Sequence, residues 1–281
     1  MAAIIEQVEA PADLRPEVVG RNPWALAARR LWRNRIAMVA LGLFLFIVVI
    51  CVAALVLYGG RSSLLIGIGS ALICCAVATV VALIAGYFGG VTDSILSRVM
   101  DIIWAFPLYL LAISIGTELL THSQGFQFGP LHVSASSLWV PTIIIAFVYI
   151  PYVYRPIRGQ VLSVVRKEFV EAAIAAGSSA WRLIFSEVLP NVVSTVIVLL
   201  PLMIATTILT EAALSFLGIG VQPPNVSWGT IISGGEDLLY TRPWVSIAPG
   251  IMIVLTVLSL NVFGDGVRDA LDPRAKLRVG E

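Results

Sequence analysis

Long apolar segments alternate with short polar segments along most of the chain, and this pattern predicts membrane-spanning helices. An α-helix needs roughly 20 apolar residues to cross about 30 Å of hydrocarbon. We expect spans at residues 36–57, 64–87, 102–120, 138–154, 188–217 and 245–263. Pro107, Pro141, Pro151 and Pro201 fall within them, and we expect Pro107 to kink the third span. The sequence therefore predicts an all-α integral membrane protein with about six transmembrane helices.

The same pattern divides the chain into a membrane domain, residues 36–264, and two polar tails, residues 1–35 and 265–281. The N-terminal tail has no apolar segment of the kind found in a cleavable signal peptide. It ends in a run of Trp and Arg residues, which favours a helix at the membrane interface. The loops between spans are expected to include a turn at 58–63, a bend holding Asp93 and Arg98, and polar loops at 121–137 and 218–243.

The most polar internal segment, about residues 166–187, predicts two short helices with a turn between them. Glu168 and Glu171 begin the first helix, where the positive end of the helix dipole favours carboxylates. Ala172 and Ala173 add almost no side chain, and Gly177 suits a left-handed C-terminal cap. The second helix and the start of the fifth span carry Trp181, Arg182, Leu189 and Pro190. This pattern favours a helix–turn–helix that a partner grips at the membrane surface; the alternative is an amphipathic interfacial hairpin.

The distribution of basic residues predicts the orientation of the chain in the membrane. With the N-terminus in the cytoplasm, 16 of the 18 Lys and Arg residues lie on the cytoplasmic side, and only Arg61 and Arg242 lie outside. Cytoplasmic segments of membrane proteins carry such an excess of Lys and Arg. We therefore expect both termini and the helix–turn–helix segment to be cytoplasmic.

Composition agrees with a polytopic membrane protein and excludes several other classes. The 281-residue chain is 58% hydrophobic and only 12% charged, whereas a soluble domain has about 25% charged residues. Its net charge of +1 argues against a nucleic-acid partner, which would need a clustered basic surface. The cysteines, Cys51, Cys74 and Cys75, all lie in apolar runs, so we expect buried thiols and not disulfides or metal ligands.

Motifs of catalytic or cofactor-binding sites are not found in the sequence. A phosphate-binding loop would place a Lys and a Ser or Thr after glycines, but the two lysines, Lys167 and Lys276, follow no glycine. His122 and His132 share one outer loop without the spacing of a zinc site. We therefore expect no catalytic residue, metal site or cofactor on this chain. If transport requires energy, another chain must supply it.

Acidic residues within or near spans are candidates for a transport pathway, because burying a carboxylate in a membrane is costly. Asp101 and Glu118 lie near span ends, where an interfacial position is expected. Glu211 lies well inside the fifth span, between Thr210 and Ser215. We take Glu211, Thr210 and Ser215 as candidates to line a pathway, where Glu211 either meets a cationic amine or holds a neighbouring helix by hydrogen bonds. The sequence leaves both roles open.

The polar segment also resembles the "EAA" loop of ABC-importer permease subunits. Glu171-Ala172-Ala173, Gly177 and Leu189-Pro190 match that signature, although Glu187 stands where the family usually has Ile. Seven further stretches resemble the second, or C-type, subunit of the dipeptide, oligopeptide and nickel branch. They are Arg33-Asn-Arg35, Gly86-Tyr-Phe-Gly-Gly90, Ala105-Phe-Pro107, Arg158-Gly-Gln-Val-Leu162, Leu214-Ser-Phe-Leu-Gly218, Val221-Gln-Pro-Pro224 and Gly264-Asp-Gly-Val-Arg268-Asp-Ala-Leu-Asp-Pro273.

The resemblance implies a type I importer fold in a bacterial or archaeal cytoplasmic membrane. It implies that this chain forms half of a pathway for dipeptides or oligopeptides with a homologous permease subunit. Two cytoplasmic ATPase subunits or domains would bind ATP and Mg and receive the helix–turn–helix segment in a cleft. An extracytoplasmic peptide-binding protein would dock on the outer loops, at Gln222, Pro223, Pro224 and Trp228.

Three alternatives remain at this stage. The same kind of subunit could carry nickel or another small solute. An ion-coupled secondary transporter is less favoured because no inverted repeat is evident. A membrane enzyme would need clustered catalytic residues. The first outer loop also departs from the family, whose members usually carry a longer insert with Gly-Thr-Asp and Gly-Arg-Asp in place of residues 58–63.

Overall fold

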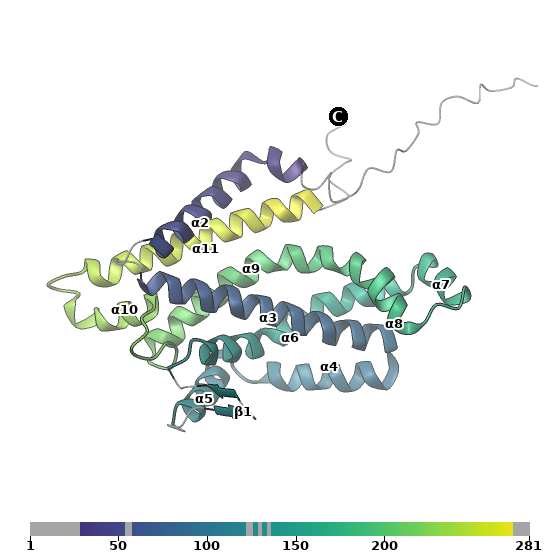
Figure 1. Ribbon diagram of the computed structural model, residues 1–281, viewed down its shortest axis with the longest axis horizontal. Coiled ribbons are helices and arrows are strands. Elements are labelled where there is room, and N and C mark those ends of the chain that lie inside the picture. Colours follow the sequence, from purple (N-terminus) through teal and green to yellow (C-terminus); the bar gives the residue numbers. More distant parts are fainter. Residues whose placement is uncertain (1–28, 54–57, 122–125, 129–130, 134–135, 272–281) are drawn as a thin grey trace, which may run out of the picture.

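Long helices packed side by side make up most of the structure (Figure 1). The computed structural model describes residues 29–53, 58–121, 126–128, 131–133 and 136–271 of the chain. The long helices are α2 (Arg35–Ala53), α3 (Tyr58–Phe88), α4 (Gly90–Ala105), α5 (Leu108–Thr121), α6 (Trp139–Val165), α9 (Leu189–Phe216) and α11 (Trp244–Leu271). The short elements are β1 (Phe126–Phe128), β2 (Leu131–Val133), α7 (Glu168–Ala175), α8 (Ala180–Leu183), the π-helical turn η2 (Ile184–Val188), α10 (Trp228–Gly234) and the 3₁₀ turn η3 (Glu236–Leu238).

The predicted all-α membrane fold is confirmed, with one small exception. Strands β1 and β2 pair antiparallel within the outer loop between α5 and α6. Everything else that is regular among the described residues is helical.

Helix α3 lies against α6 and α9 and forms the centre of the bundle (Figure 1). Its small residues allow this close approach, because a Cβ atom on Gly86 would lie 2.5 Å from a methyl carbon of Val161 in α6. Ala71, Ala78 and Ala82 of the same helix are fully buried. Small side chains on α3 therefore let α6 and α9 pack close to its backbone.

Among the described residues, four helical stretches are long and apolar enough to cross a membrane, namely Gly59–Phe88, Trp139–Val165, Ala180–Phe216 and Trp244–Leu271. Helices α4 and α5 together form a fifth, broken stretch that bends by 88° at Pro107. The kink predicted at this proline is thus confirmed, and it follows from the missing N–H and the bulk of the proline ring. The described apolar part of α2, Arg35–Ile47, is shorter, so the count of six spans stays a prediction.

Several predicted loop boundaries are wrong because polar residues occur inside helices. Residues 58–63 are not a turn but the first turns of α3, where Ser62 and Ser63 are buried. The expected bend around Asp93 and Arg98 is part of helix α4. Helix α6 runs eleven residues beyond Tyr154, the predicted end of the fourth span. In each case the helix continues where its polar side chains find partners or reach a polar boundary.

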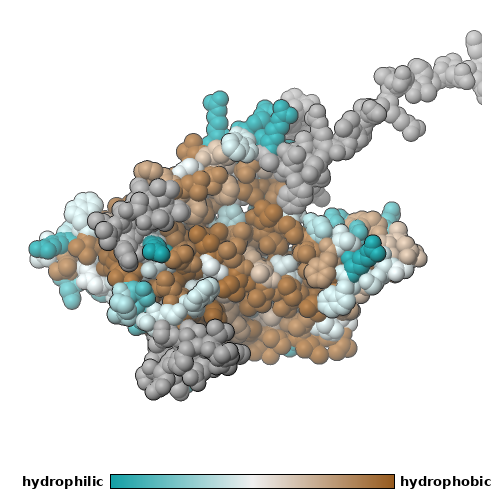
Figure 2. Space-filling view, viewed as in Figure 1, coloured by the Kyte–Doolittle hydropathy of each residue, from teal (hydrophilic) through white to brown (hydrophobic). Residues whose placement is uncertain are grey.

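Polar character is concentrated at the two ends of the bundle. In Figure 2 hydrophobic side chains cover the middle of the visible face, while hydrophilic ones gather toward the ends. Helices α7 and α8 lie at one end, and α10 lies at the opposite end (Figure 1). This arrangement matches a protein that spans a bilayer and exposes a different polar surface on each side.

Candidate functional site

Helix α7 and the turn after it have the geometry that the sequence predicts. Glu168 and Glu171 lie in the first turn of α7. The helix ends in a Schellman motif, in which the Ser178 amide donates to the carbonyl of Ala173 at 3.1 Å and the Gly177 amide to that of Ile174 at 2.9 Å. Gly177 takes the left-handed conformation that this motif requires, with φ of +81°. The glycine therefore fixes the direction in which the chain leaves α7.

Four buried apolar side chains anchor this segment to the bundle. Val170 of α7 is fully buried, and so are Leu183, Ile184 and Val188 just before α9. The remaining surface of the segment faces outward, including Glu168, Glu171, Ala172 and Arg182. The segment (hereafter the α7–α8 segment, residues 168–188) is thus anchored to the bundle on one side, and its other side is exposed.

An exposed aromatic cluster forms one side of the α7–α8 segment. The ring of Trp181 stacks on that of Phe185 at 6.3 Å between centroids and meets the edge of Phe88, from the end of α3, at 6.2 Å. The three side chains remain 57%, 61% and 50% exposed, respectively. Exposed, rigid aromatic side chains of this kind often dominate the binding energy of protein interfaces. The geometry suits a docking surface for another protein.

The second helix of the segment, α8, runs without a break into the fifth span. Helices α8 and α9 form one uninterrupted helical rod, Ala180–Phe216, joined through the π-helical turn η2. In this turn the Leu189 amide bonds to the carbonyl of Ile184, one residue further back than in an α-helix. Pro190 follows directly, and the wider turn accommodates a residue that has no N–H to donate. Leu189 is half-buried and Pro190 exposed at the start of α9.

A polar network beside this segment was not predicted as a site. The Arg158 guanidinium of α6 binds both carboxylate oxygens of Asp93 in the first turn of α4. Ser97 contacts the same carboxylate at 3.4 Å and the Tyr154 hydroxyl at 3.0 Å. The sequence signal was available, because an Asp and an Arg stand in largely apolar surroundings. This network joins α4 to α6 near the end of α6 that leads into α7.

Glu211, Thr210 and Ser215 lie inside the bundle of this chain. Glu211 is fully buried and accepts a 2.6 Å hydrogen bond from the Ser215 hydroxyl, which also accepts one from the Val221 amide at 3.0 Å. Thr210 shares a 2.8 Å hydrogen bond with Tyr149 of α6. The structure thus brings Glu211 and Ser215 together and turns Thr210 toward α6, with each side chain bonded within the chain.

The outer-loop candidates divide into exposed and buried residues. Pro223 and Pro224 are exposed, and the half-buried Gln222 donates to the carbonyl of Gly218 at 3.0 Å. Trp228 is 1% exposed, and its backbone amide donates to the Ser63 hydroxyl of α3 at 3.1 Å. Its indole ring therefore packs within the chain and is not presented to a partner. Within the described residues, no three His, Cys, Asp or Glu side chains are grouped as metal ligands.

Comparison with known proteins gives matches over nearly the whole chain. Residues 78–277 match the model of the binding-protein-dependent transport system inner membrane component. Residues 22–61 match the N-terminal transmembrane domain of oligopeptide transport permease C.

Similar proteins carry related names. A putative peptide transport system permease protein of Brucella abortus is 34% identical, covering 96% of this chain and 99% of the relative. A dipeptide transport system permease protein of Alkalihalophilus pseudofirmus is 40% identical, covering 79% of this chain and 68% of the relative. An oligopeptide transport system permease protein of Haemophilus influenzae is 32% identical, covering 92% of this chain and 91% of the relative. With its several apolar spans and these matches, the chain belongs to the family of binding-protein-dependent transport system inner membrane components.

Proposed function

We propose that this chain is the C-type permease subunit of an ATP-driven importer for dipeptides or oligopeptides. Its relatives are named as peptide, dipeptide and oligopeptide permeases, which supports this substrate class. The chain pairs with a homologous permease subunit, and the pathway lies between the two. It has no catalytic role itself, since two partner ATPase subunits or domains bind ATP and Mg and perform the hydrolysis.

The observation that carries this proposal is the construction of the α7–α8 segment. Its outer surface combines exposed aromatic rings with small alanine side chains, and its second helix continues directly into α9. A partner that holds this surface therefore acts on a spanning helix without an intervening flexible loop. Closure of the ATPases on ATP shifts the α7–α8 segment, and α9 carries the shift into the membrane.

Such coupling needs a difference in affinity between two states. ATP drives the change only if the ATPases bind one conformation of the permease more tightly than the other. By reciprocity, the permease conformation that binds the ATPases better also favours their ATP-bound form. On the opposite side, we propose that a peptide-binding protein docks at Gln222, Pro223 and Pro224, with Trp228 supporting the loop from within.

A substitution at Gly177, with Gly218 as a matched control, tests the docking role. Both glycines have φ of +81°, and a Cβ atom at either would meet nothing within 4 Å. Replacement by Leu therefore causes the same backbone strain of roughly 1–2 kcal/mol at both positions. We expect Gly177→Leu to weaken retention of the ATPases during purification and to lower ATP-driven uptake of a labelled dipeptide in proteoliposomes. Gly218→Leu should retain the ATPases, because it lies at the other end of α9.

Two results would contradict the proposal. Equal retention of the ATPases by both variants would remove the α7–α8 segment as the docking surface. Dipeptide uptake that runs on an ion gradient without ATP would instead indicate a secondary transporter.

A further inference from the structure

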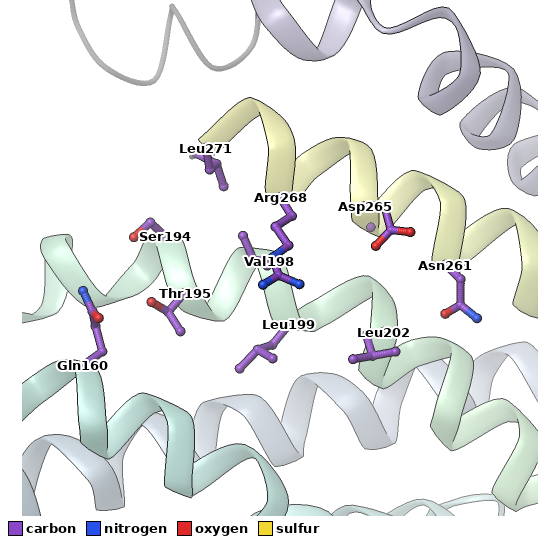
Figure 3. A pocket seen from close by; sticks show the side chains of 11 residues that line it. Gln160, Ser194, Thr195, Val198, Leu199, Leu202, Asn261, Asp265, Arg268 and Leu271 are labelled. Carbon is purple, nitrogen blue, oxygen red and sulfur yellow. The ribbon is translucent and has the colours of Figure 1, made fainter. Parts of the chain in front are cut away.

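Two grooves flank the pair formed by α9 and α11, and their linings differ in polarity. One groove, with a volume of about 870 Å³, also touches α6 and carries six polar side chains. They are Gln160, Ser194, Thr195, Asn261, Asp265 and Arg268. In Figure 3 the side chains of Arg268 and Asn261 extend from α11 toward α9. We refer to this hollow as the polar groove.

The second groove lies between the same two helices and α2, and each of its twelve lining residues is apolar. From α9 it takes Ile197, Leu200 and Ile204, and from α11 Phe263 and Val267. This apolar groove suits lipid acyl chains. The two grooves lie on different faces of the same two helices, and these faces differ in polarity.

The charges in the polar groove need an aqueous surrounding or a partner. Asp265 and Arg268 line it, and within the described part of the chain neither has an ion-pair partner. Both residues lie just past the expected end of the sixth span, at the membrane boundary. Ser194, Thr195 and Asn261 lie within the expected spans, where lipid would offer their polar atoms no hydrogen-bond partner. The polar groove is therefore a poor match to lipid.

All three helices place the polar groove in the half of the bundle that bears the α7–α8 segment. Gln160 is five residues before the end of α6, and Ser194 is five residues after the start of α9. On α11 the lining extends from Leu271, at the helix end, back to Asn261. With 1.5 Å of rise per residue, the groove reaches about 15 Å into the bundle along α11.

Helix α6 extends polar character beyond this groove. Its exposed residues Tyr152, Arg155, Gly159 and Ser163 recur at helical spacing along one face, beside Gln160. Arg155 pairs with Asp101 of α4 at 3.0 Å and lies over the Trp104 ring, yet both charged side chains are about half exposed. An exposed ion pair near the expected span ends marks the aqueous boundary on this side.

We propose that the polar groove is this chain's wall of the cytoplasmic half of the transport pathway, and that it conducts a zwitterionic short peptide through water. This inference rests on the importer function proposed above. A volume of about 870 Å³ lies within the roughly 300–1,000 Å³ typical of small-ligand sites. Asp265 and Arg268 stand about 4.5 Å apart along the helix axis and offer opposite charges to the amino and carboxylate ends of a peptide.

Cysteine labelling tests this assignment with two positions on one helix. Thr195→Cys lies in the polar groove and Leu200→Cys in the apolar groove. Each is placed in a chain whose native cysteines are replaced, assembled with its partner subunits, and reconstituted into vesicles with the α7–α8 side outward. We expect a charged, membrane-impermeant maleimide to modify Thr195→Cys about tenfold faster than Leu200→Cys, because only an aqueous thiol ionises and reacts readily. Millimolar dialanine should slow that reaction.

The possible results separate the two levels of the proposal. Equally slow labelling at both positions, or reaction of Thr195→Cys with a hydrophobic maleimide alone, would overturn the groove assignment. If dialanine leaves the labelling rate of Thr195→Cys unchanged, the peptide does not pass through this groove. ATP-driven uptake is measured in the same vesicles, and its absence in the parent complex would instead overturn the importer function. If Thr195→Cys fails to assemble, Gln160→Cys occupies the same groove and serves in its place.

Discussion

Single polar side chains hold the helices of this bundle together where lipid offers no hydrogen-bond partner. Thr207 of α9 donates to the carbonyl of Gly67 in α3 at 2.8 Å, and Ser70 of α3 donates to that of Thr142 in α6 at 3.0 Å. Such interhelical bonds average about 0.6 kcal/mol and reach about 1.7. Glu211 instead bonds within its own helix, to Ser215 of α9, whose hydroxyl also accepts from the Val221 amide in the loop that follows. We therefore favour a hydrogen-bonding role for Glu211 over direct contact with substrate.

Removal of the Ser215 hydroxyl tests this role. We expect Ser215→Ala to destabilise the purified protein by about 1–3 kcal/mol, because it removes one hydrogen bond of the buried Glu211 carboxylate and leaves the Val221 amide without the Ser215 hydroxyl as acceptor. The measurement is the midpoint of thermal unfolding in detergent. Ser194→Ala on the same helix is the control, with an expected change within about 0.5 kcal/mol, because its hydroxyl bonds only to Asn191 of its own helix. Equal midpoints for the two variants would remove the structural role.

At the scale of elements, the α7–α8 segment combines a capped turn with a rigid extension. Gly177 and the Schellman motif separate α7 from the rest, whereas α8 continues through η2 into α9. A π-helical turn within a helix often marks a functional position. Force applied at Trp181 therefore reaches the membrane along one helix axis, while the buried Val170 side chain holds α7 against the bundle.

Truncation of the aromatic cluster should weaken ATPase binding. We expect Trp181→Ala to raise the dissociation constant between the detergent-solubilised permease and its ATPase by roughly 30-fold, or about 2 kcal/mol, because an exposed indole is a frequent hot spot. Trp244→Ala at the opposite end of the bundle is the control, since Trp244 is 69% exposed and Trp181 57%. Similar losses from both substitutions would place the ATPase contact elsewhere.

At the scale of the whole molecule, the arrangement of charges sets the two sides apart. Arg61, near the start of α3, and Arg242, just before α11, lie at the end of the bundle that carries α10. Arg166, Lys167 and Arg182 lie at the other end, beside α7 and α8. The basic end is therefore expected to face the cytoplasm.

Labelling and fusion reporters check this orientation. We expect Tyr240→Cys to react with an impermeant thiol reagent in intact cells, because Tyr240 is fully exposed between η3 and α11. A fluorescent protein fused to the C-terminus, after α11, should fold and emit only on the cytoplasmic side. Labelling of Tyr240→Cys that requires permeabilised cells would reverse the topology and exclude cytoplasmic ATPase docking at the α7–α8 segment.

The apolar character of the long helices and the turn after α7 are local properties, and the sequence predicts them, although several helix boundaries differ. Pro107 bends its span and Gly177 ends its helix because each residue restricts or frees its own backbone. Interactions between distant residues escape such reasoning. Asp93 looks like part of a loop until Arg158, 65 residues away, pairs with it. Trp228 looks like an exposed docking residue until its side chain packs among residues of α3, α9 and α11.

Because α8 continues without a break into α9, the number of residues between the aromatic cluster and the membrane fixes how the two are oriented relative to each other. One residue added between Phe185 and Leu189 would turn Trp181 and Phe185 by about 100° about the rod axis, away from Phe88 of α3, and displace them by about 1.5 Å. An ATPase docked on the cluster, as we propose, could then no longer engage it and orient the membrane portion correctly. The number of residues across this join therefore sets the orientation of the docking surface relative to α9. Insertions and deletions that surface loops readily absorb should abolish coupling here, even where every contact residue is kept.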